Sequence, residues 1–427
     1  MNNGDAFFDN LPKDWTITKI GAVFDIKQGK SLSSRKQTGI YLKPFLRTSN
    51  VFWGRLDLSH LDEMDFTDNE CKTLTLEHGD LLVCEGGDIG RTTIWRNEKT
   101  ECYYQNHLHR LRVKDKKIEP LFIMYWMQVA LTQLGIYEGF GNKTTIPNLS
   151  SSRLREFILP LPEKKEQQKI AAILSKIQQA IEIQESIIAK MRELKKTTLH
   201  YVFTHGLRGE NTKETEIGQV PESWIIKKIG DLGKIVTGTT PPTKNKEYYQ
   251  GGHYQFIAPN DIGKTTRIYK AEKKITDKGL EVSRLLPKES VCFVCIGSTI
   301  GKVGITVEEK TTTNQQINTV IVNHDSDPYF VTYLMDYKSE YIASFASPSP
   351  VPILSKGKFE EISIMLSPNM TEQQEIARVL MIIDETIEIH AAKKSALQDL
   401  FKAMLNKLMT GEIRVKDLDI DVSEVST

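Results

Sequence analysis

The sequence lacks the segments that direct a chain into or across a membrane. Its start contains Asp5, Asp9 and Asp14 and has no basic stretch followed by an apolar run, so it does not resemble a signal peptide. No later stretch reaches the ~18 consecutive apolar residues that a membrane-spanning helix needs. We therefore expect a cytoplasmic protein that does not enter a membrane.

Metal-ligand clusters are also missing. Only five cysteines are present, and two of them, Cys292 and Cys295, have the spacing of a ligand pair. They fall inside the apolar run 291–296, which predicts a buried strand, and no second ligand pair follows in a loop, so a structural role is favoured over zinc. His107 and His109 should share one face of a predicted strand, but no carboxylate or cysteine cluster adjoins them. We expect no metal site.

Catalytic motifs are absent as well. A base methyltransferase needs an Asn/Asp-Pro-Pro-aromatic loop and a glycine-rich cofactor loop, and the nearest stretch, residues 240–243, is Thr-Pro-Pro-Thr. Residues 297–303 resemble a phosphate-binding loop, but the glycine spacing is one residue short and no Ser or Thr follows the lysine. No Ser/His/Asp or Cys/His arrangement follows from the spacing. We therefore expect no catalytic residues and a protein that recognises a ligand.

The bulk composition is that of a folded, multidomain protein. With 39% hydrophobic and 26% charged residues over 427 positions, the chain should form roughly two to four packed units. The net charge of +1 neither favours nor excludes nucleic acid, because clustering matters more than the total. Residues 26–55 are basic without one acid, and residues 56–88 are mainly acidic, which suggests one basic and one acidic surface or simply solvated faces.

The chain contains an internal duplication. Trp15 corresponds to Trp224, and further identities share that offset or shift by a few residues. Residues 166–171 correspond in the same way to residues 372–377, with Glu-Gln-Gln-x-Ile-Ala in both. Each copy is far longer than a solenoid repeat, so the chain is a duplicated two-part module. The identities in the first stretch are Pro12, Trp15, Lys19, Ile20, Gly21, Ile26 and Gly29 against Pro221, Trp224, Lys228, Ile229, Gly230, Ile235 and Gly238.

The first part of each module is a mixed α/β domain. Short apolar runs end at Gly, Asn and Asp, which is typical of strands and tight turns, and residues 119–132 and 327–341 have helical patterns. The fold class is therefore α/β (α+β) with a pseudo-two-fold duplication. The predicted parts are a first domain at 11–162, a long helix at 163–208, a linker at 209–218, a second domain at 219–368, a second long helix at 369–411 and an acidic tail at 412–427.

The second part of each module is a long helix with a heptad seam. Gln184 and His390 occupy equivalent polar positions of the two seams, and a polar seam residue usually fixes register. Paired with each other, they would lock the helices antiparallel. The alternative is that each helix packs only on its own domain. The predicted helix-pairing residues are Ile170, Leu174, Ile177, Ile181, Gln184 and Ile188 in the first seam and Ile376, Leu380, Ile383, Ile387 and His390 in the second.

Together these features resemble the specificity subunit of Type I restriction-modification systems. Both modules open with Pro-x-x-Trp, carry an Ile-Gly-Arg or Ile-Gly-Lys turn and an amide cluster, and continue into Glu-Gln-Gln-x-Ile-Ala. The resemblance covers about residues 11–411. It implies two target recognition domains, each reading one half of a bipartite double-stranded DNA site, held apart by an antiparallel coiled coil. A helix of ~40 residues is roughly 60 Å long, enough to span neighbouring major-groove faces ~34 to 36 Å apart.

The resemblance also implies partners and cofactors that this chain does not itself carry. Two methylation subunits that use S-adenosylmethionine would bind it, together with two restriction subunits that use ATP and magnesium. A recognition arm of a Type IIB-like restriction system and a coiled-coil adaptor without DNA binding are the alternatives. A stand-alone enzyme is disfavoured, since the catalytic loops are missing.

The side chains expected to contact DNA are amides and cations at turns. Asn and Gln can read adenine, Arg and Lys can read guanine or bind phosphate, and each could instead cap a turn or belong to the core. The candidates are Lys30, Arg35, Lys43, Arg47, Asn50, Arg91, Gln105, Asn106, His107, Asn142 and Lys143 in the first module and Thr239, Thr240, Lys244, Asn260, Asp261, Ser298, Lys302, Asn314, Gln315 and Gln316 in the second.

Overall fold

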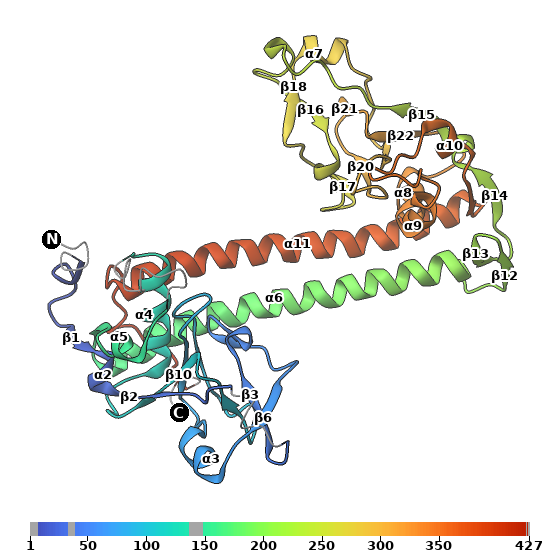
Figure 1. Cartoon of the computed structure of the whole chain (residues 1–427). Coiled ribbons are helices and arrows are strands. Elements are labelled where there is room, and N and C mark those ends of the chain that lie inside the picture. The colour runs from blue at the N-terminus through green and yellow to red at the C-terminus, as the bar shows by residue number, and fades with distance from the viewer. Residues whose placement is uncertain (1–6, 33–38, 136–147, 424, 426–427) are drawn as a thin grey trace. The chain divides into compact units, whose positions relative to one another are not determined.

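The chain forms two compact units, each with one mixed α/β domain and part of each of two long helices (Figure 1). Unit 1 comprises residues 1–183 and 395–427, and unit 2 comprises residues 184–394. Among the described residues, no helix has both the length and the apolar content of a membrane span. The computed structural model describes residues 7–32, 39–135, 148–423 and 425.

The domain of unit 1 is built on two small sheets. The larger has the antiparallel order β2-β10-β7-β8, and the smaller has the order β6-β3-β9. The pair β1-β11 joins the start of the domain to its end. The elements are β1 (Thr16–Lys19), α2 (Ile20–Val23), β2 (Phe24–Gln28), β3 (Leu42–Leu46), η2 (Thr48–Asn50), β4 (Val51–Phe52), β5 (Arg55–Leu56), β6 (Asp62–Asp65), α3 (Asp68–Leu74), β7 (Leu81–Cys84), β8 (Thr92–Ile94), β9 (Tyr103–Tyr104), β10 (Leu108–Val113), α4 (Pro120–Thr132), α5 (Ser151–Arg155) and β11 (Ile158–Leu161).

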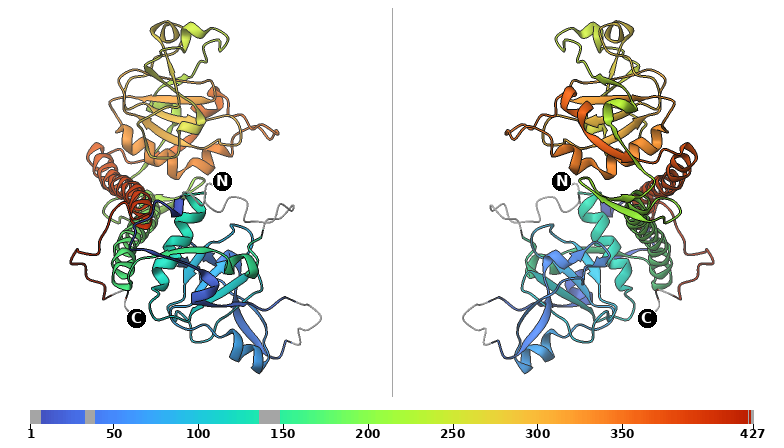
Figure 2. Two further views of the ribbon diagram at one scale, coloured as in Figure 1. Left: turned by 90° about the vertical axis from the view of Figure 1, so that its left-hand side faces the viewer. Right: turned by 90° about the vertical axis from the view of Figure 1, so that its right-hand side faces the viewer.

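Helix α4, the teal helix beside the strands of unit 1 in Figure 2, is apolar on nearly all sides and belongs to the core of that unit. It begins at Pro120, where the missing N–H leaves no helical hydrogen bond unmade. Phe122 and Trp126 are fully buried, and Trp126 Nε1 donates to the carbonyl oxygen of Ile158 at 2.9 Å. A helix that is hydrophobic all round must be covered on all sides, and α4 packs against β8 and the long helices of this unit.

The domain of unit 2 repeats this plan. Its larger sheet has the order β15-β22-β19-β20-β17, and its smaller sheet has the order β18-β16-β21. The pair β14-β23 corresponds to β1-β11. The elements are β12 (Thr212–Thr215), β13 (Gly218–Pro221), β14 (Ile225–Lys228), η3 (Ile229–Leu232), β15 (Gly233–Thr237), η4 (Lys246–Tyr248), β16 (Tyr254–Ile257), η5 (Pro259–Asp261), β17 (Arg267–Ile268), β18 (Lys273–Ile275), α7 (Asp277–Glu281), β19 (Val291–Val294), β20 (Val303–Thr306), β21 (Thr311–Thr313), β22 (Ile317–Val322), α8 (Pro328–Tyr337), α9 (Ser339–Ala343), α10 (Lys356–Glu361) and β23 (Ser363–Leu366).

The two long helices are α6 (Lys164–His205) and α11 (Met370–Met409). In unit 1 the beginning of α6 shares a core with the end of α11, and in unit 2 the remaining segments lie together, so the helices run antiparallel (Figure 1). This arrangement excludes the alternative in which each helix packs only on its own domain. The predicted fold class, two mixed α/β domains with two long antiparallel helices, is confirmed.

The seam residues are largely buried. Ile170, Leu174, Ile376 and Leu380 are fully covered because each helix also packs on a domain at that end. Ile177 and Ile387 are half-buried. Ile181, Gln184, Ile188 and Ile383 lie nearer the middle of the helices and are also buried, at 5 to 8% exposure.

The Glu-Gln-Gln sequence ties each long helix to the domain before it. Gln167 accepts a hydrogen bond from the Glu119 amide at 2.9 Å and donates to the Pro162 carbonyl at 2.8 Å. Gln373 makes the corresponding two bonds, both at 2.8 Å, with the backbone of unit 2. Both side chains are buried, so these bonds satisfy backbone groups that water cannot reach.

The predicted acidic tail is not a free tail. Arg414 donates to both carboxylate oxygens of Glu166 at 2.8 Å and to Asp14 at 2.6 and 2.9 Å. This contact holds the pKa of Asp14 down, at about 2. Val415 and Val425 are buried in the core of unit 1. The acidic residues of this segment suggested a charged tail, but the apolar residues between them determine where it packs.

The predicted linker at 209–218 is likewise folded. It contains β12, which pairs with β13 as an antiparallel hairpin. Lys213 Nζ donates to the carbonyl oxygens of Glu222 and Trp224 at 2.7 and 2.8 Å. The high content of Glu, Thr and Lys suggested a linker, but a two-stranded hairpin with one face on a domain tolerates such residues on its other face.

Candidate nucleic-acid interface

In unit 1, several predicted site residues meet at one edge of the four-stranded sheet. β2 and β7 end there and β10 and β8 begin there, because neighbouring strands are antiparallel. The Glu85 amide donates to the His107 carbonyl at 2.9 Å, and the Asn106 amide donates to the Lys30 carbonyl at 2.8 Å. We call the loops 28–30, 85–91 and 105–107 the unit 1 edge.

Unit 2 forms the same edge from the same strand ends. The Thr239 amide donates to the Thr313 carbonyl at 2.9 Å, and the Cys295 amide donates to the Gln316 carbonyl at 2.7 Å. Thr240 Oγ1 donates to Gln315 Oε1. We call the loops 237–240, 295–302 and 314–316 the unit 2 edge. The structure thus brings together side chains that lie 75 positions apart in the sequence.

Two of the duplicated glycines make these edges possible. A Cβ at Gly29 would collide with the carbonyl oxygen of Tyr104, and one at Gly238 would collide with that of Asn314. The backbone of the first strand can therefore touch the loop before β10 or β22 only if no side chain intervenes. The duplication preserves glycine at a place where the fold needs close backbone approach.

Asn50 and Asp261 serve the fold instead of projecting from an edge. Asn50 Oδ1 accepts from the Arg47 amide at 2.8 Å, and its Nδ2 donates to two backbone carbonyls at 3.0 Å each. Asp261 accepts from the Ala258 and Glu272 amides at 2.9 and 3.0 Å. Both side chains are buried turn caps, which was the alternative reading of the sequence.

Arg91 and Lys302 occupy equivalent positions with different surroundings. Arg91 donates to the Thr48 carbonyl at 3.0 Å, pairs with Asp88 at 3.2 Å and lies over the Phe52 ring. The methylene groups of Lys302 lie against Gly263, and within the described ranges its ammonium has no acidic partner. Arg91 is therefore held by its own unit, whereas Lys302 keeps an unpaired charge.

The expectation of separate basic and acidic surfaces in the first module is wrong. Lys30 pairs with Glu70 at 2.6 Å, and its side chain is only 15% exposed. Lys43 and Arg47 also pair with acids, at 2.7 Å each. β3, from the basic stretch, pairs antiparallel with β6, from the acidic stretch, so the two stretches neutralise each other.

The two histidines of the predicted strand do not share a face. β10 begins at Leu108, so His107 belongs to the preceding turn and is exposed, whereas His109 is fully buried. His109 Nε2 lies 3.1 Å from the Leu149 carbonyl oxygen, and burial lowers the pKa of the ring.

The other candidate residues differ in accessibility. Gln105 is almost fully buried, while Asn106, Thr239, Thr240, Asn314 and Gln316 are half-buried. Arg35, Asn142 and Lys143 lie outside the described residues. The exposed candidates, besides His107 and the ion-paired Arg47, are Lys244, Asn260, Ser298 and Gln315.

Sequence reasoning missed two members of the unit 1 edge. Gln28 Nε2 donates to Glu85 Oε2 at 3.0 Å and to the Asn106 carbonyl at 2.8 Å. Their signal was available, because Gln28 directly precedes the duplicated Gly29 and Glu85 directly follows the apolar run 81–84.

The Cys-x-x-Cys pair is structural. Cys292 and Cys295 are buried, and each sulfur accepts a hydrogen bond from β22, from Thr319 at 3.7 Å and Asn318 at 3.2 Å. Burial raises the pKa of both thiols to about 12, which keeps them protonated. Across the described part of the chain, no three His, Cys, Asp or Glu side chains gather as metal ligands do.

The polar pair of the heptad seam is formed within unit 2. His390 Nδ1 and Gln184 Oε1 lie 2.7 Å apart, and Gln184 is 5% exposed. One turn away Lys394 pairs with Glu185 at 2.9 Å. These directional contacts couple two neighbouring positions of α6 to two positions one turn apart on α11.

A polar network that sequence reasoning also missed joins the unit 2 domain to the helices. Asp384 pairs with Lys195 at 2.7 Å and accepts hydrogen bonds from Thr266 at 2.6 Å and Tyr333 at 2.7 Å. Arg267 pairs with Glu385 at 2.9 Å. Lys195 of α6 also donates to Thr266 Oγ1 at 3.1 Å, so the domain is bonded to both α6 and α11.

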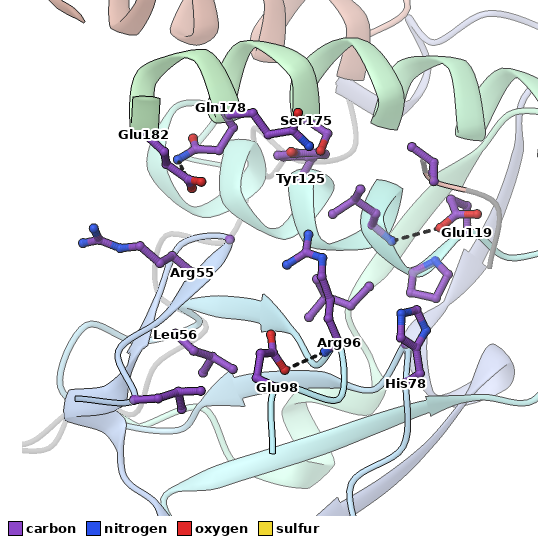
Figure 3. Close-up of a pocket in the computed structure, with 18 residues that line it drawn as sticks. Arg55, Leu56, His78, Arg96, Glu98, Glu119, Tyr125, Ser175, Gln178 and Glu182 are labelled. Atoms are coloured by element: carbon purple, nitrogen blue, oxygen red, sulfur yellow. Dashed lines mark hydrogen bonds between the residues drawn. The ribbon is translucent and has the colours of Figure 1, made fainter. Parts of the chain in front are cut away.

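The corresponding place in unit 1 is an open groove of about 380 Å³. Arg55, Arg96 and Glu98 of the domain face α6 across it (Figure 3). Gln178 and Glu182 of α6 bond to each other at 3.2 Å instead of to the domain. Its mixture of cations, amides and carboxylates favours no single class of ligand.

The comparison with protein families decides the identity. The profile of the family described as "Type I restriction modification DNA specificity domain" matches residues 12–193 and again residues 221–399. The chain belongs to this family. It is a DNA specificity subunit of the Type I kind, which is the non-catalytic subunit of a restriction-modification complex.

Known relatives agree in length and fold. The provisionally named MjaX specificity subunit of Methanocaldococcus jannaschii is 26% identical over 427 aligned residues, covering 95% of each chain. The MjaVIII specificity subunit of the same organism is 24% identical and covers 96% of this chain and 95% of its own. The crystal structure of an S subunit from M. genitalium matches with a TM-score of 0.63, at 16% identity, over 94% of this chain and 96% of its own.

Proposed function

We propose that this specificity subunit reads an asymmetric bipartite site in double-stranded DNA, one half through the unit 1 edge and the other through the unit 2 edge. The supporting observation is that the same four strand ends build a polar edge in both units, yet the side chains differ. A common scaffold with unlike contacts favours two unlike half-sites.

The contacts divide by chemistry. Asn106, Gln315 and Gln316 are accessible amides that can pair with adenine, whereas Lys302 and Lys244 carry charges suited to phosphate. Arg47 and Arg91 can bind DNA only if each gives up its ion pair with an acid of unit 1. Asn50 and Asp261 stabilise their turns and therefore affect recognition only through the shape of the loops.

The proposal includes partners for this chain. Two methylation subunits supply S-adenosylmethionine-dependent transfer, and two restriction subunits supply ATP- and magnesium-dependent cleavage, in the cytoplasm where the chromosome is accessible. The family assignment supports these partners, and the antiparallel helices supply a scaffold of two similar halves on which two copies can dock.

Domain exchange tests the division of labour. Residues 11–162 are replaced by the corresponding stretch of another specificity subunit, and the chain is expressed with its methylation subunit. Sequencing of methylated adenines should show one changed half-site and an unchanged spacer, because the helices are untouched. As a matched control, residues 219–368 are exchanged, which should change only the other half. Changes in both halves, or in neither, would refute the proposal.

A further inference from the structure

The segment after α9 displays apolar side chains to solvent. We call residues 344–353 the proline loop, because it contains Pro348, Pro350 and Pro352. Within it, Val351 is 54% and Ile353 is 45% exposed. Isolated exposed apolar residues are common, but several on one short loop that proline stiffens mark a surface suited to contact.

The proline loop is held in shape by its own hydrogen bonds. The Ser347 amide donates to the Ile353 carbonyl at 2.9 Å, and the Ile353 amide donates to Ser347 Oγ at 3.2 Å. The Ser349 amide donates to the Ser347 carbonyl at 2.9 Å. The apolar side chains therefore stay outside, and little conformational entropy remains to be lost when they make a contact.

The proline loop adjoins the unit 2 edge. Ile353 forms an antiparallel bridge with Ile296, and the Gly297 amide donates to the Pro352 carbonyl at 3.0 Å. The Leu354 amide donates to the Cys295 carbonyl at 2.8 Å. Gly297 in turn lies next to the amide nitrogen of Gln316. An apolar surface is thus continuous with the amides of the candidate interface.

The amides define the partner of that surface. Gln315 Oε1 accepts from Thr240 and Gln316 Oε1 accepts from Asn314, which leaves the Nε2 groups of both glutamines without a hydrogen bond among the described residues. Glutamine reads adenine in the major groove, and the thymine paired with that adenine exposes its C5 methyl group in the same groove. Apolar side chains beside such amides match an A·T pair.

We propose that Val351 and Ile353 contact thymine methyl groups in the half-site read by unit 2. This inference rests on the proposed function. Phe345, the third exposed apolar residue of the proline loop, packs edge-on against Tyr341 with ring centroids 5.2 Å apart and supports the loop from its base.

The test uses the complex of the full chain with its methylation subunit. The probe is a duplex carrying the site found by methylome sequencing, with the thymines of one half-site at a time replaced by deoxyuridine, which lacks only the methyl group. Replacement in the unit 2 half should weaken binding about fourfold for each contacted methyl, the effect of exposing one methyl-sized group. The Val351→Ser/Ile353→Ser chain should bind the thymine duplex more weakly and lose sensitivity to deoxyuridine.

A matched control is Ile226→Ser, which also removes an apolar side chain that is 61% exposed. Ile226 lies in β14, beyond the start of β15, whereas the unit 2 edge lies at the end of β15. Its complex should keep the deoxyuridine response of the unaltered chain. Co-purification with the methylation subunit checks assembly in every variant.

Three results would overturn the inference. The first is a deoxyuridine response that survives in the double variant, and the second is an unaltered complex whose binding does not change when deoxyuridine replaces thymine in the unit 2 half. The third is a double variant that fails to bind the methylation subunit, because the proline loop would then be a protein contact. In the first two cases the complex still distinguishes its site from unrelated duplexes. Loss of that distinction in the unaltered complex would instead refute the proposed function.

Discussion

The domains of the two units share a backbone plan but differ in how the charges of their candidate DNA-binding residues are balanced. In unit 1, Lys30, Lys43, Arg47 and Arg91 are all paired with acids of the same unit. In unit 2, Lys244 and Lys302 have no acidic partner in the described ranges, and the amides bond to one another instead. The family fold therefore constrains where side chains project and leaves their chemistry open.

A physical reason underlies this freedom. Side chains at strand ends contribute little to the core, so replacing them costs little stability. The cations of unit 1 must leave an acid before they can bind a phosphate, which reduces the net gain from each contact. The free lysines of unit 2 need only release counterions. We expect unit 2 to supply more of the salt-dependent affinity.

The largest expected effect concerns the glutamates that open the two long helices. Arg414→Met should destabilise unit 1 by about 2 to 4 kcal/mol, because Glu166, 2% exposed, would lose its charged partner. This range is set below that of a fully buried pair, since Arg414 is 26% exposed. Denaturant unfolding measures it.

The matched variant acts on the other module. Glu372 accepts from Ser367 Oγ and the Leu207 amide rather than from an arginine. Ser367→Ala should therefore cost only about 1 kcal/mol, the usual value for one neutral hydrogen bond. Equal losses in the two variants would show that the two junctions are energetically alike.

A second contrast lies between the apolar seam of unit 1 and the polar pair of unit 2. His390→Leu alone should cost about 1 to 3 kcal/mol, because the buried Gln184 amide loses its partner. Gln184→Leu combined with His390→Leu should recover that loss and raise the melting temperature while loosening helix register. Thermal unfolding and the spacer length in the methylome are the two measurements. A double variant less stable than the single one would contradict this role.

The third contrast is between a free and a paired lysine. Lys302→Met should lower the slope of log affinity against log salt concentration by about 0.9, the value for one lost phosphate contact. Lys30→Met should leave the slope unchanged, because that ammonium is already bound by Glu70. Anisotropy titrations of the complex over a salt series distinguish them. A smaller slope for Lys30→Met would restore the sequence-based expectation that Lys30 contacts phosphate.

The smallest effect is a pH dependence confined to unit 1. The folded pKa of Asp14, about 2, lies below its ordinary value of 3.8, so its pairing stabilises the protein above pH 3.8 and is lost as the pH falls towards 2. Asp14→Asn should therefore reduce stability slightly at neutral pH and have no effect near pH 2. Unfolding curves at both pH values test this, and no counterpart is expected in unit 2, where Glu372 is bound by neutral donors and not by an arginine.

The parts of the fold that were predicted well are those that the sequence marks by periodicity or by internal repetition. The heptad steps from Ile170 and Ile376 predicted the long helices, and the duplicated Trp and glycine positions predicted equivalent domains. Two segments were predicted poorly, the linker and the tail, because composition was the only guide there. Ile217 of the linker and Val415 of the tail are single apolar residues that pack on a surface contributed by distant parts of the chain.

For the candidate interface, the sequence alone determined which residue types stand at turns, because glycine spacing and strand-ending patterns are local. Only the tertiary structure decided which of those side chains remain available. In the sequence, nothing distinguishes Asn50 and Lys30 from Asn106 and Lys302. In the structure, however, backbone groups and Glu70 of unit 1 bind the side chains of Asn50 and Lys30. Hydrogen bonds and ion pairs form between residues that the sheet brings together from far apart in the chain, so no local pattern can reveal them.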